Sequence, residues 1–175
     1  MATMILLPDG SSGHTSHWVA NTGTHEDALD DDNGDTSYVS TSSNNRYLIL
    51  TYANPSVAEG DIDFSVAPSV RFLSSGRSTH RSTDSEVDIL IVNPLGNLVV
   101  TVSYDAGLSY ETINGTALPY SNPGLNTPWS YANLENLSLK CTKNGTVGVR
   151  LSYLALEVTY TGAVADNATF FGANF

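Results

Sequence analysis

The sequence contains a single cysteine, and this scarcity limits both its covalent cross-links and its chemistry. Cys141 has no second thiol in the chain with which to form a disulfide. It continues the apolar alternation of Leu137 and Leu139, which predicts a small core residue rather than a reactive thiol. We therefore expect neither a disulfide scaffold nor redox chemistry.

Charged residues are also scarce, at 14% of the chain against roughly 25% in an ordinary soluble domain. Ser, Thr, Asn and Gly take their place on the surface. Seven Lys and Arg against eighteen Asp and Glu give a formal net charge of −11. Because such a chain repels phosphate backbones, nucleic acid is a poor candidate partner.

Long apolar runs and basic leader segments are missing as well. The first ten residues hold one short apolar patch, residues 4–7, which has no preceding basic residue and ends at Pro8. This pattern predicts neither a signal peptide nor a membrane span. We expect synthesis in a cytoplasm and no membrane partner.

Helical periodicity is almost absent, whereas short apolar alternations bounded by Gly, Pro, Asn and Ser recur throughout the chain. This pattern predicts an all-β fold, an antiparallel β-sandwich of jelly-roll type. The expected strands are residues 38–41, 46–53, 61–74, 86–93, 97–104, 137–141 and 146–161. We expect one domain at residues 18–162, preceded by an arm at 1–17 and followed by an apolar tail at 163–175.

Two turns and one irregularity refine this expectation. Residues 93–97 combine Pro and Gly between two strands, which predicts that the flanking strands pair directly. Residues 143–146 contain Asn-Gly, which predicts a second hairpin with a type I′ turn. In residues 146–160 the apolar alternation changes phase after Tyr153, which predicts either a β-bulge or burial on both faces.

Three stretches in order carry a resemblance to a known group of proteins. They are the acidic turn and strand start of residues 29–39, the Asn-Pro-Gly-Leu-Asn-Thr-Pro-Trp-Ser segment of residues 122–130, and the alternating strand of residues 149–160. This ordered set resembles tailed-phage and prophage virion structural proteins of jelly-roll, concanavalin-like type, which are mostly uncharacterised.

The resemblance implies a non-enzymatic structural protein located in the virion. A capsid decoration (cement) protein or a neck or tail component would fit it, with copies of itself and major capsid or tail proteins as partners. It supplies no catalytic residues.

The segment from residue 104 to residue 133 is rich in Gly and Pro and carries interleaved aromatic residues, namely Tyr110, Tyr120, Trp129 and Tyr131. Long aromatic loops are where sandwiches place binding surfaces. These side chains could stack on sugars, which would make the chain a carbohydrate-binding or receptor-binding module. Alternatively, they pack the loop onto the core, and a large aromatic such as Trp129 closes one end of the sandwich.

The C-terminal tail holds three phenylalanines, Phe170, Phe171 and Phe175, with little polar patterning. Three exposed phenylalanines would form an apolar patch of the kind that monomers avoid. We therefore expect the tail to dock on a neighbouring subunit in a homo-oligomer. The expectation of a trimer rests on analogy with viral proteins alone.

An acidic cluster precedes the first expected strand of the domain, and Asp30, Asp31, Asp32 and Asp35 stand in its centre. Ca²⁺ takes six to eight oxygen ligands and could bind here. The EF-hand spacing fails, because Leu29 and Ser40 would occupy ligand positions. The alternative is a solvated acidic turn without a cation.

No motif indicates catalysis. The spacing of His14, His17 and His25 matches no closed zinc site. A nucleophile elbow, a phosphate-binding glycine loop and the HExxH pattern are all missing from the sequence. We expect the protein not to be an enzyme and to need no cofactor other than a possible Ca²⁺.

Overall fold

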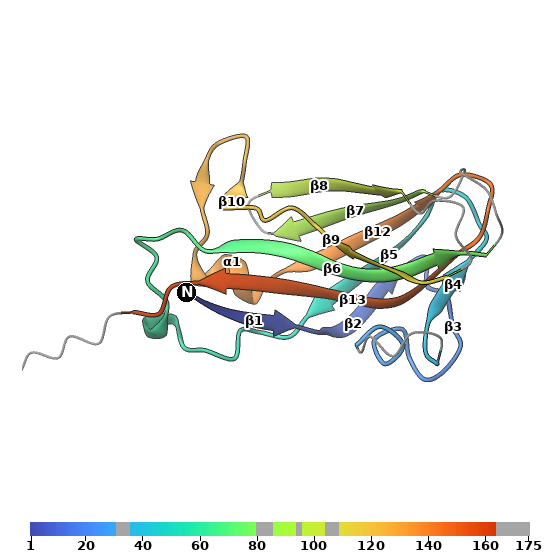
Figure 1. Cartoon of the computed structure of the whole chain (residues 1–175), viewed down its shortest axis with the longest axis horizontal. Coiled ribbons are helices and arrows are strands. Elements are labelled where there is room, and N and C mark those ends of the chain that lie inside the picture. The colour runs from blue at the N-terminus through green and yellow to red at the C-terminus, as the bar shows by residue number, and fades with distance from the viewer. Residues whose placement is uncertain (31–35, 80–85, 94–95, 104–108, 164–175) are drawn as a thin grey trace, which may run out of the picture.

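The computed structural model describes residues 1–30, 36–79, 86–93, 96–103 and 109–163 of the chain. They form two antiparallel sheets that face each other (Figure 1). Sheet A is made of β1 (Ala2–Leu6), β3 (Val19–Ala20), β4 (Val39–Thr41), β6 (Ser69–Ser78), β9 (Glu111–Asn114) and β13 (Val149–Tyr160). Sheet B is made of β2 (Pro8–Gly13), β5 (Arg46–Tyr52), β7 (Glu86–Asn93), β8 (Gly96–Ser103) and β12 (Ser138–Asn144).

Shorter elements lie outside these two sheets. A small ribbon pairs β10 (Tyr120–Asn122) with β11 (Thr127–Pro128), and it is followed by the one-turn helix α1 (Tyr131–Glu135). A 3₁₀ turn, η1 (Glu59–Asp61), precedes β6. In the described part of the chain, no helix is long and apolar enough to cross a membrane.

The strand order is that of a jelly roll. Sheet A contains the order β4-β13-β6-β9 and sheet B the order β5-β12-β7-β8. The chain thus alternates between the sheets, and its last long strand returns to lie beside its early ones, as in two interlocked Greek keys. The prediction of an antiparallel jelly-roll sandwich is therefore confirmed.

The long strands that alternation predicted are present, and β7 pairs directly with β8 as expected. The strand expected at residues 61–74 is shorter, because β6 begins only at Ser69. Its first part instead forms a turn in which the backbone N–H of Ser65 donates to the Asp63 carboxylate at 2.9 Å. Pro68, which has no N–H to donate to a ladder, then separates the turn from the strand.

The hairpin expected at residues 143–146 is a connection of a different kind. Strand β12 pairs with β5 and β7, whereas β13 pairs with β4 and β6, so the two are in different sheets. Gly145 does adopt a positive φ of 84°, as a tight turn requires. The Asn-Gly pair therefore carries the chain from sheet B to sheet A instead of joining paired strands.

The first residues belong to the sandwich and do not form a separate arm. Strand β1 pairs with the C-terminal half of β13, and β2 pairs with β5, so the N-terminal segment contributes to both sheets. Met4 and Leu6 point into the core and are buried. The domain boundary expected at residue 17 therefore does not hold at the level of packing.

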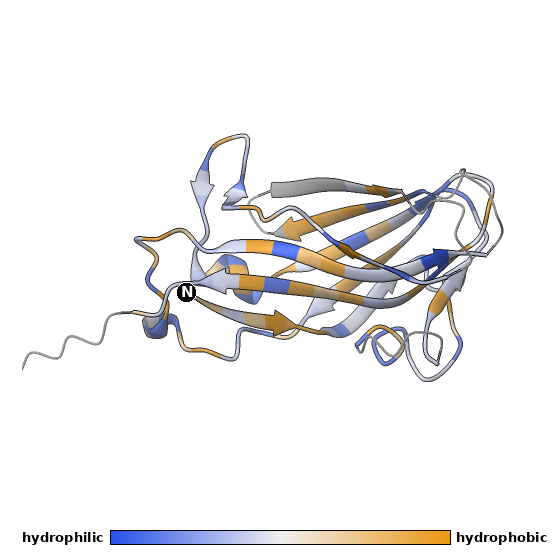
Figure 2. Ribbon diagram, viewed as in Figure 1, coloured by the Kyte–Doolittle hydropathy of each residue, from blue (hydrophilic) through white to orange (hydrophobic). Residues whose placement is uncertain are grey.

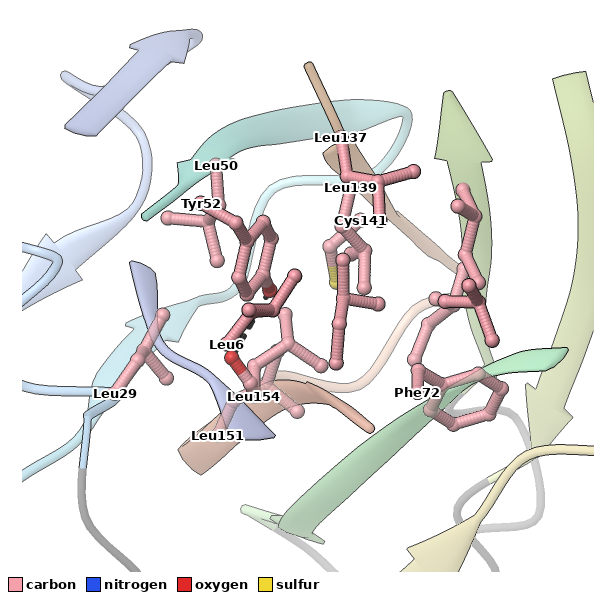
Figure 3. Close-up of a cluster of buried hydrophobic side chains, with 14 of the residues drawn as sticks. Leu6, Leu29, Leu50, Tyr52, Phe72, Leu137, Leu139, Cys141, Leu151 and Leu154 are labelled. Atoms are coloured by element: carbon pink, nitrogen blue, oxygen red, sulfur yellow. Dashed lines mark hydrogen bonds between the residues drawn. The ribbon is translucent and has the colours of Figure 1, made fainter. Parts of the chain in front are cut away.

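The core lies between the sheets and is almost entirely apolar. Figure 2 shows hydrophobic and hydrophilic residues alternating along β6 and β13, as expected when one face of a strand is buried. Figure 3 shows the close-packed side chains, among them Leu6, Leu151 and Leu154 from sheet A and Leu50, Tyr52 and Leu139 from sheet B. Cys141 is fully buried, which confirms its prediction as a core residue.

Polar groups at the edge of the core are tied to the backbone. The Tyr52 hydroxyl crosses the sandwich and donates to the Leu154 carbonyl at 2.9 Å. The carbonyl of Leu29 accepts from the Leu154 N–H at 3.1 Å, beside the stretch of β13 between its pairings with β4 and β1. The fully buried Leu29 side chain belongs to the same core cluster (Figure 3). The start of the acidic segment is thus anchored in the structure.

Candidate functional site

Two of the loop aromatics are held in place by the fold. Trp129 is 2% exposed, and its indole N–H donates to the Leu118 carbonyl at 2.8 Å. The Tyr131 ring packs against the core, and its hydroxyl donates to the Val57 carbonyl at 2.9 Å. The structure therefore favours the packing interpretation for these two side chains, and Trp129 is not available to stack on a sugar.

The other two loop aromatics lie far from each other. Tyr120 is half-buried in β10, where it pairs with Pro128. Tyr110 immediately precedes Glu111, which pairs with Gly76 near the end of β6, whereas Leu118 bridges to Val70 near the beginning of β6. The segment between them runs along the length of β6. The four loop aromatics consequently do not gather into one binding surface, as the sugar-stacking alternative would require.

The other predicted sites receive less support or fall outside the described residues. Asp30 is exposed, whereas Asp31, Asp32 and Asp35 are not described, so the Ca²⁺ site stays a prediction. Phe170, Phe171 and Phe175 also lie outside the described residues, and the oligomer and virion partners stay predictions with them. Within the described ranges, no three His, Cys, Asp or Glu side chains gather as a metal site would need.

The three N-terminal histidines do not converge. The rings of His14 and His17 lie 6.0 Å apart, and the His14 ring is 4.2 Å from that of Tyr47. His25 instead makes a 2.6 Å hydrogen bond with the Trp18 carbonyl. His14 therefore packs at the start of β5, His25 is held by the backbone of Trp18, and His17 lines the pocket described below.

A different set of side chains meets on the outer face of sheet A. On β13, Val149 and Leu151 point into the core, so Arg150 between them points outward. Arg150 lies directly opposite Ser40 of β4 on one side and Arg77 of β6 on the other. Strand register, which places these residues in one row, thus brings two arginines side by side.

Each of these arginines lies over a tyrosine ring. The guanidinium carbon of Arg150 is 4.4 Å from the centre of the Tyr38 ring, and that of Arg77 is 5.3 Å from the centre of the Tyr110 ring. We call the row Tyr38, Arg150, Arg77 and Tyr110 the arginine–tyrosine strip. It crosses sheet A from the β4 side to the β9 side, about 14 Å at about 4.8 Å per strand spacing.

A pocket of about 250 Å³ opens beside Arg150 at the β4 end of the strip. Its lining is rich in hydroxyls and includes Val19, Ser40, Ser42, Thr79, Gly148 and Arg150. The wall is fixed in part because the Thr79 hydroxyl and backbone N–H both donate to the Gly148 carbonyl, at 3.0 and 2.9 Å. A Cβ on Gly148 would lie 2.7 Å from the Thr79 hydroxyl, so glycine is needed for this approach.

Tyr153 lies on the same outer face of sheet A, further along β13 than Arg150. The bulge in β13 places both Ser152 and Tyr153 against Ser75 of β6, with Tyr153 registered opposite Ser75 on the outward side. Tyr153 is half-buried, while Ser152 is fully buried and its hydroxyl donates to the Ser75 carbonyl at 3.5 Å. This part of the outer face of sheet A thus brings Tyr38, Tyr110 and Tyr153 together with Arg77, Arg150 and the hydroxyl-lined pocket.

Of this arrangement, sequence analysis found only Tyr110. The outward direction of Arg150 could have been read from its position between Val149 and Leu151, but its neighbours could not. The two arginines are in strands far apart in the chain, and only the register of β13 on β6 brings them together.

Comparison with known proteins gives structural likenesses only. No protein-family model matches the sequence, and no curated protein matches it. Among solved structures, the xylan-binding module CBM15 is similar at 8% identity, with 93% of this chain and 100% of that one covered and a TM-score of 0.48.

Two further structures are similar over most of the chain. The CBM36-1 domain of a multidomain xylanase from the hindgut metagenome of Trinervitermes trinervoides shares 13% identity, with 93% of this chain and 100% of that one covered and a TM-score of 0.47. The family 11 carbohydrate-binding module from Clostridium thermocellum, in complex with a β-1,3-1,4-mixed-linked tetrasaccharide, shares 16% identity over 89% of this chain and 86% of that one, with a TM-score of 0.39.

Proposed function

We propose that this chain is a non-catalytic module that binds a polysaccharide across the outer face of sheet A. The observation that carries the proposal is the arginine–tyrosine strip together with the adjoining pocket. Tyrosine rings offer flat apolar surfaces to the C–H faces of sugars, while arginine and serine or threonine side chains hydrogen-bond to sugar hydroxyls. Both kinds of group lie here on one face of a rigid sheet.

The shape of the face favours a polymer over a small molecule. A site for an enclosed ligand usually has a volume of roughly 300–1,000 Å³, whereas the pocket beside Arg150 has about 250 Å³. The rest of the strip lies on the surface of a sheet. We infer that one sugar unit enters the pocket while the adjoining units lie along the strip over Tyr38 and Tyr110.

Rigid strands position these groups, which favours binding without rearrangement. Arg150, Arg77 and Ser40 are strand residues in a continuous antiparallel ladder. Two hydrogen bonds with Asn21 hold the backbone of Tyr38. The Tyr38 N–H donates to the Asn21 side-chain oxygen at 2.6 Å, and the Asn21 N–H donates to the Tyr38 carbonyl at 3.0 Å. Little conformational entropy therefore remains to be lost when a ligand binds.

Affinity electrophoresis in gels that contain polysaccharides tests this proposal. The panel contains xylan, mixed-linkage β-glucan, galactan and acidic plant and bacterial polysaccharides. We expect at least one polymer to retard the protein. Tyr38→Ala should lose most of that retardation, because the variant lacks one of the two tyrosine rings of the strip.

The matched control is Tyr47→Ala, which removes a half-buried tyrosine from the outer face of sheet B. It should leave the retardation unchanged. Failure of every polymer to retard the wild-type protein, or a loss caused by Tyr47→Ala and not by Tyr38→Ala, would contradict the proposal. Thermal melts of both variants show whether they are folded.

A further inference from the structure

The cross-strand pair of Arg150 and Arg77 is unusual for this chain. The protein has a formal net charge of −11 and only seven Lys and Arg residues. Like charges placed directly opposite each other in a sheet are destabilising. Two of the few cations nevertheless occupy neighbouring positions on β13 and β6, so that two guanidinium groups lie side by side on one face of an acidic protein.

The same two strands show what a neutralised pair looks like. Six residues away on β6, Arg71 lies opposite Glu157 of β13, and the Arg71 Nε donates to the Glu157 carboxylate at 2.6 Å. Among the described residues, Arg150 forms no such ion pair with an acidic side chain. The position opposite Arg150 holds Arg77, another cation, rather than an acid.

The contact of Arg150 with Tyr38 orients the guanidinium without neutralising it. A cation over an aromatic ring is held by the electrons of the ring face and keeps its full positive charge. The N–H donors of a guanidinium lie in its plane and form a fork that matches two oxygens of a carboxylate or similar oxyanion. Arg150 also lines the pocket, so a ligand in the pocket can reach this group.

We propose that the polysaccharide bound by this face is anionic, and that an oxyanion of one of its units, a carboxylate or a sulfate, binds Arg150 beside Arg77. This inference rests on the proposed function and narrows it to one class of ligand. The net charge of the whole protein repels a densely charged polymer at long range. The site therefore suits polymers whose acidic units are spaced among neutral ones.

The test compares polymers that differ only in their acidic groups. Isothermal titration calorimetry of the full chain uses glucuronoxylan and the same glucuronoxylan after its carboxyl groups have been reduced to hydroxymethyl groups. We expect the native polymer to bind about tenfold more tightly, as one charge-assisted hydrogen-bonded contact would give. Chondroitin sulfate and desulfated chondroitin form a second pair, which shows whether the preferred oxyanion is sulfate.

Arg150→Gln should remove this preference and bring the two forms of the polymer to within about twofold of each other. Its affinity for the carboxyl-reduced polymer should fall by a smaller factor than its affinity for the native polymer, and thermal melts show that the variant is folded. Lys140→Gln, the control, removes the same charge from the outer face of sheet B and should leave the preference intact.

The outcomes separate this inference from the proposed function. Equal binding of acidic and neutral forms in both polymer pairs would overturn the inference and leave the proposed function standing. A preference for the acidic form that survives Arg150→Gln would also overturn it. Failure to bind any polymer in either form would overturn the proposed function, and the inference with it.

Discussion

Leu151 and Leu156 lie on β13 at an odd spacing, yet both side chains point into the same core and both are 0% exposed. In a regular strand, residues at an odd spacing point to opposite faces. The β-bulge between Leu151 and Tyr153 inserts one residue and restores the phase. The change of phase in the sequence is therefore a bulge, and both halves of the strand use one face for the core.

The first prediction concerns these two leucines. Leu151→Ala and Leu156→Ala should each lower the free energy of unfolding by about 2–5 kcal/mol, because each leaves a cavity in a close-packed core. Leu125→Ala serves as the control, since Leu125 is 76% exposed. Urea denaturation measures all three, and a nearly silent change at either core leucine would contradict the bulge.

The second prediction concerns a close approach between Gly115 and the ring of Phe72. A Cβ on Gly115 would lie 2.4 Å from two carbons of that ring, whereas a Cβ on Gly60 would meet nothing within 4 Å. Gly115→Ala should therefore destabilise the protein by about 1–3 kcal/mol through overpacking. Gly60→Ala should change stability by less than about 0.5 kcal/mol. Equal melting temperatures for the two variants would show that the Phe72 ring moves aside freely.

The third prediction concerns the Cys141 thiol, whose pKa is raised by burial and, to a lesser extent, by the nearby Asp88 carboxylate. Since the folded state holds the thiol proton more tightly than the unfolded state, this contribution to stability is complete below the unfolded pKa of about 8.5. It is lost progressively as the pH rises above that value. The loss of stability between pH 8 and pH 10 should thus be smaller in Cys141→Val than in the wild type.

Thiol labelling gives an independent check on the same residue. Ellman's reagent should modify Cys141 of the native protein at pH 8 only at the rate of unfolding, and rapidly in denaturant, because the thiolate is the reactive form. Rapid labelling of the native protein would show that the site opens to solvent.

The fourth prediction concerns the turn of Thr24 and Asp27. The pKa of the Asp27 carboxyl is lowered, first by the backbone N–H of Thr24, which donates to it at 2.9 Å, and then by the Thr24 side chain. A lowered carboxyl pKa stabilises the folded state above the unfolded value of about 3.9, and the contribution is lost as the pH falls through the folded pKa. Melting temperatures measured between pH 6 and pH 2 should fall less in Asp27→Asn than in the wild type.

Sequence reasoning predicted the long strands because their apolar residues alternate, as in β5, β7 and β13. It missed β2, whose Pro-Asp-Gly-Ser-Ser-Gly sequence has no residues that favour strands. That strand exists because β5 offers it an edge for pairing. The Asn-Gly turn at Gly145 was recognised, but the sheet to which the chain continues depends on contacts far away in the sequence.

The binding face was harder to predict than the fold. The aromatic residues in loops suggested Trp129 as a ligand-binding residue. A large aromatic ring before a short helix can equally well close the core, and Trp129 has this role in the structure. Arg150 and Arg77 carry no local signal of a site. Their proximity follows from the register between β13 and β6, which depends on the bulge.

Mapping a bound polysaccharide on the two sheets by NMR tests the central claim most directly. Amide chemical shifts of the ¹⁵N-labelled protein are followed while an oligosaccharide of the best-binding polymer is added. We predict that the changes concentrate on the outer face of sheet A, at Ser40, Ser75 and Arg150, and spare Thr142 on the outer face of sheet B. Changes centred on sheet B, or no changes with any polymer, would contradict the account.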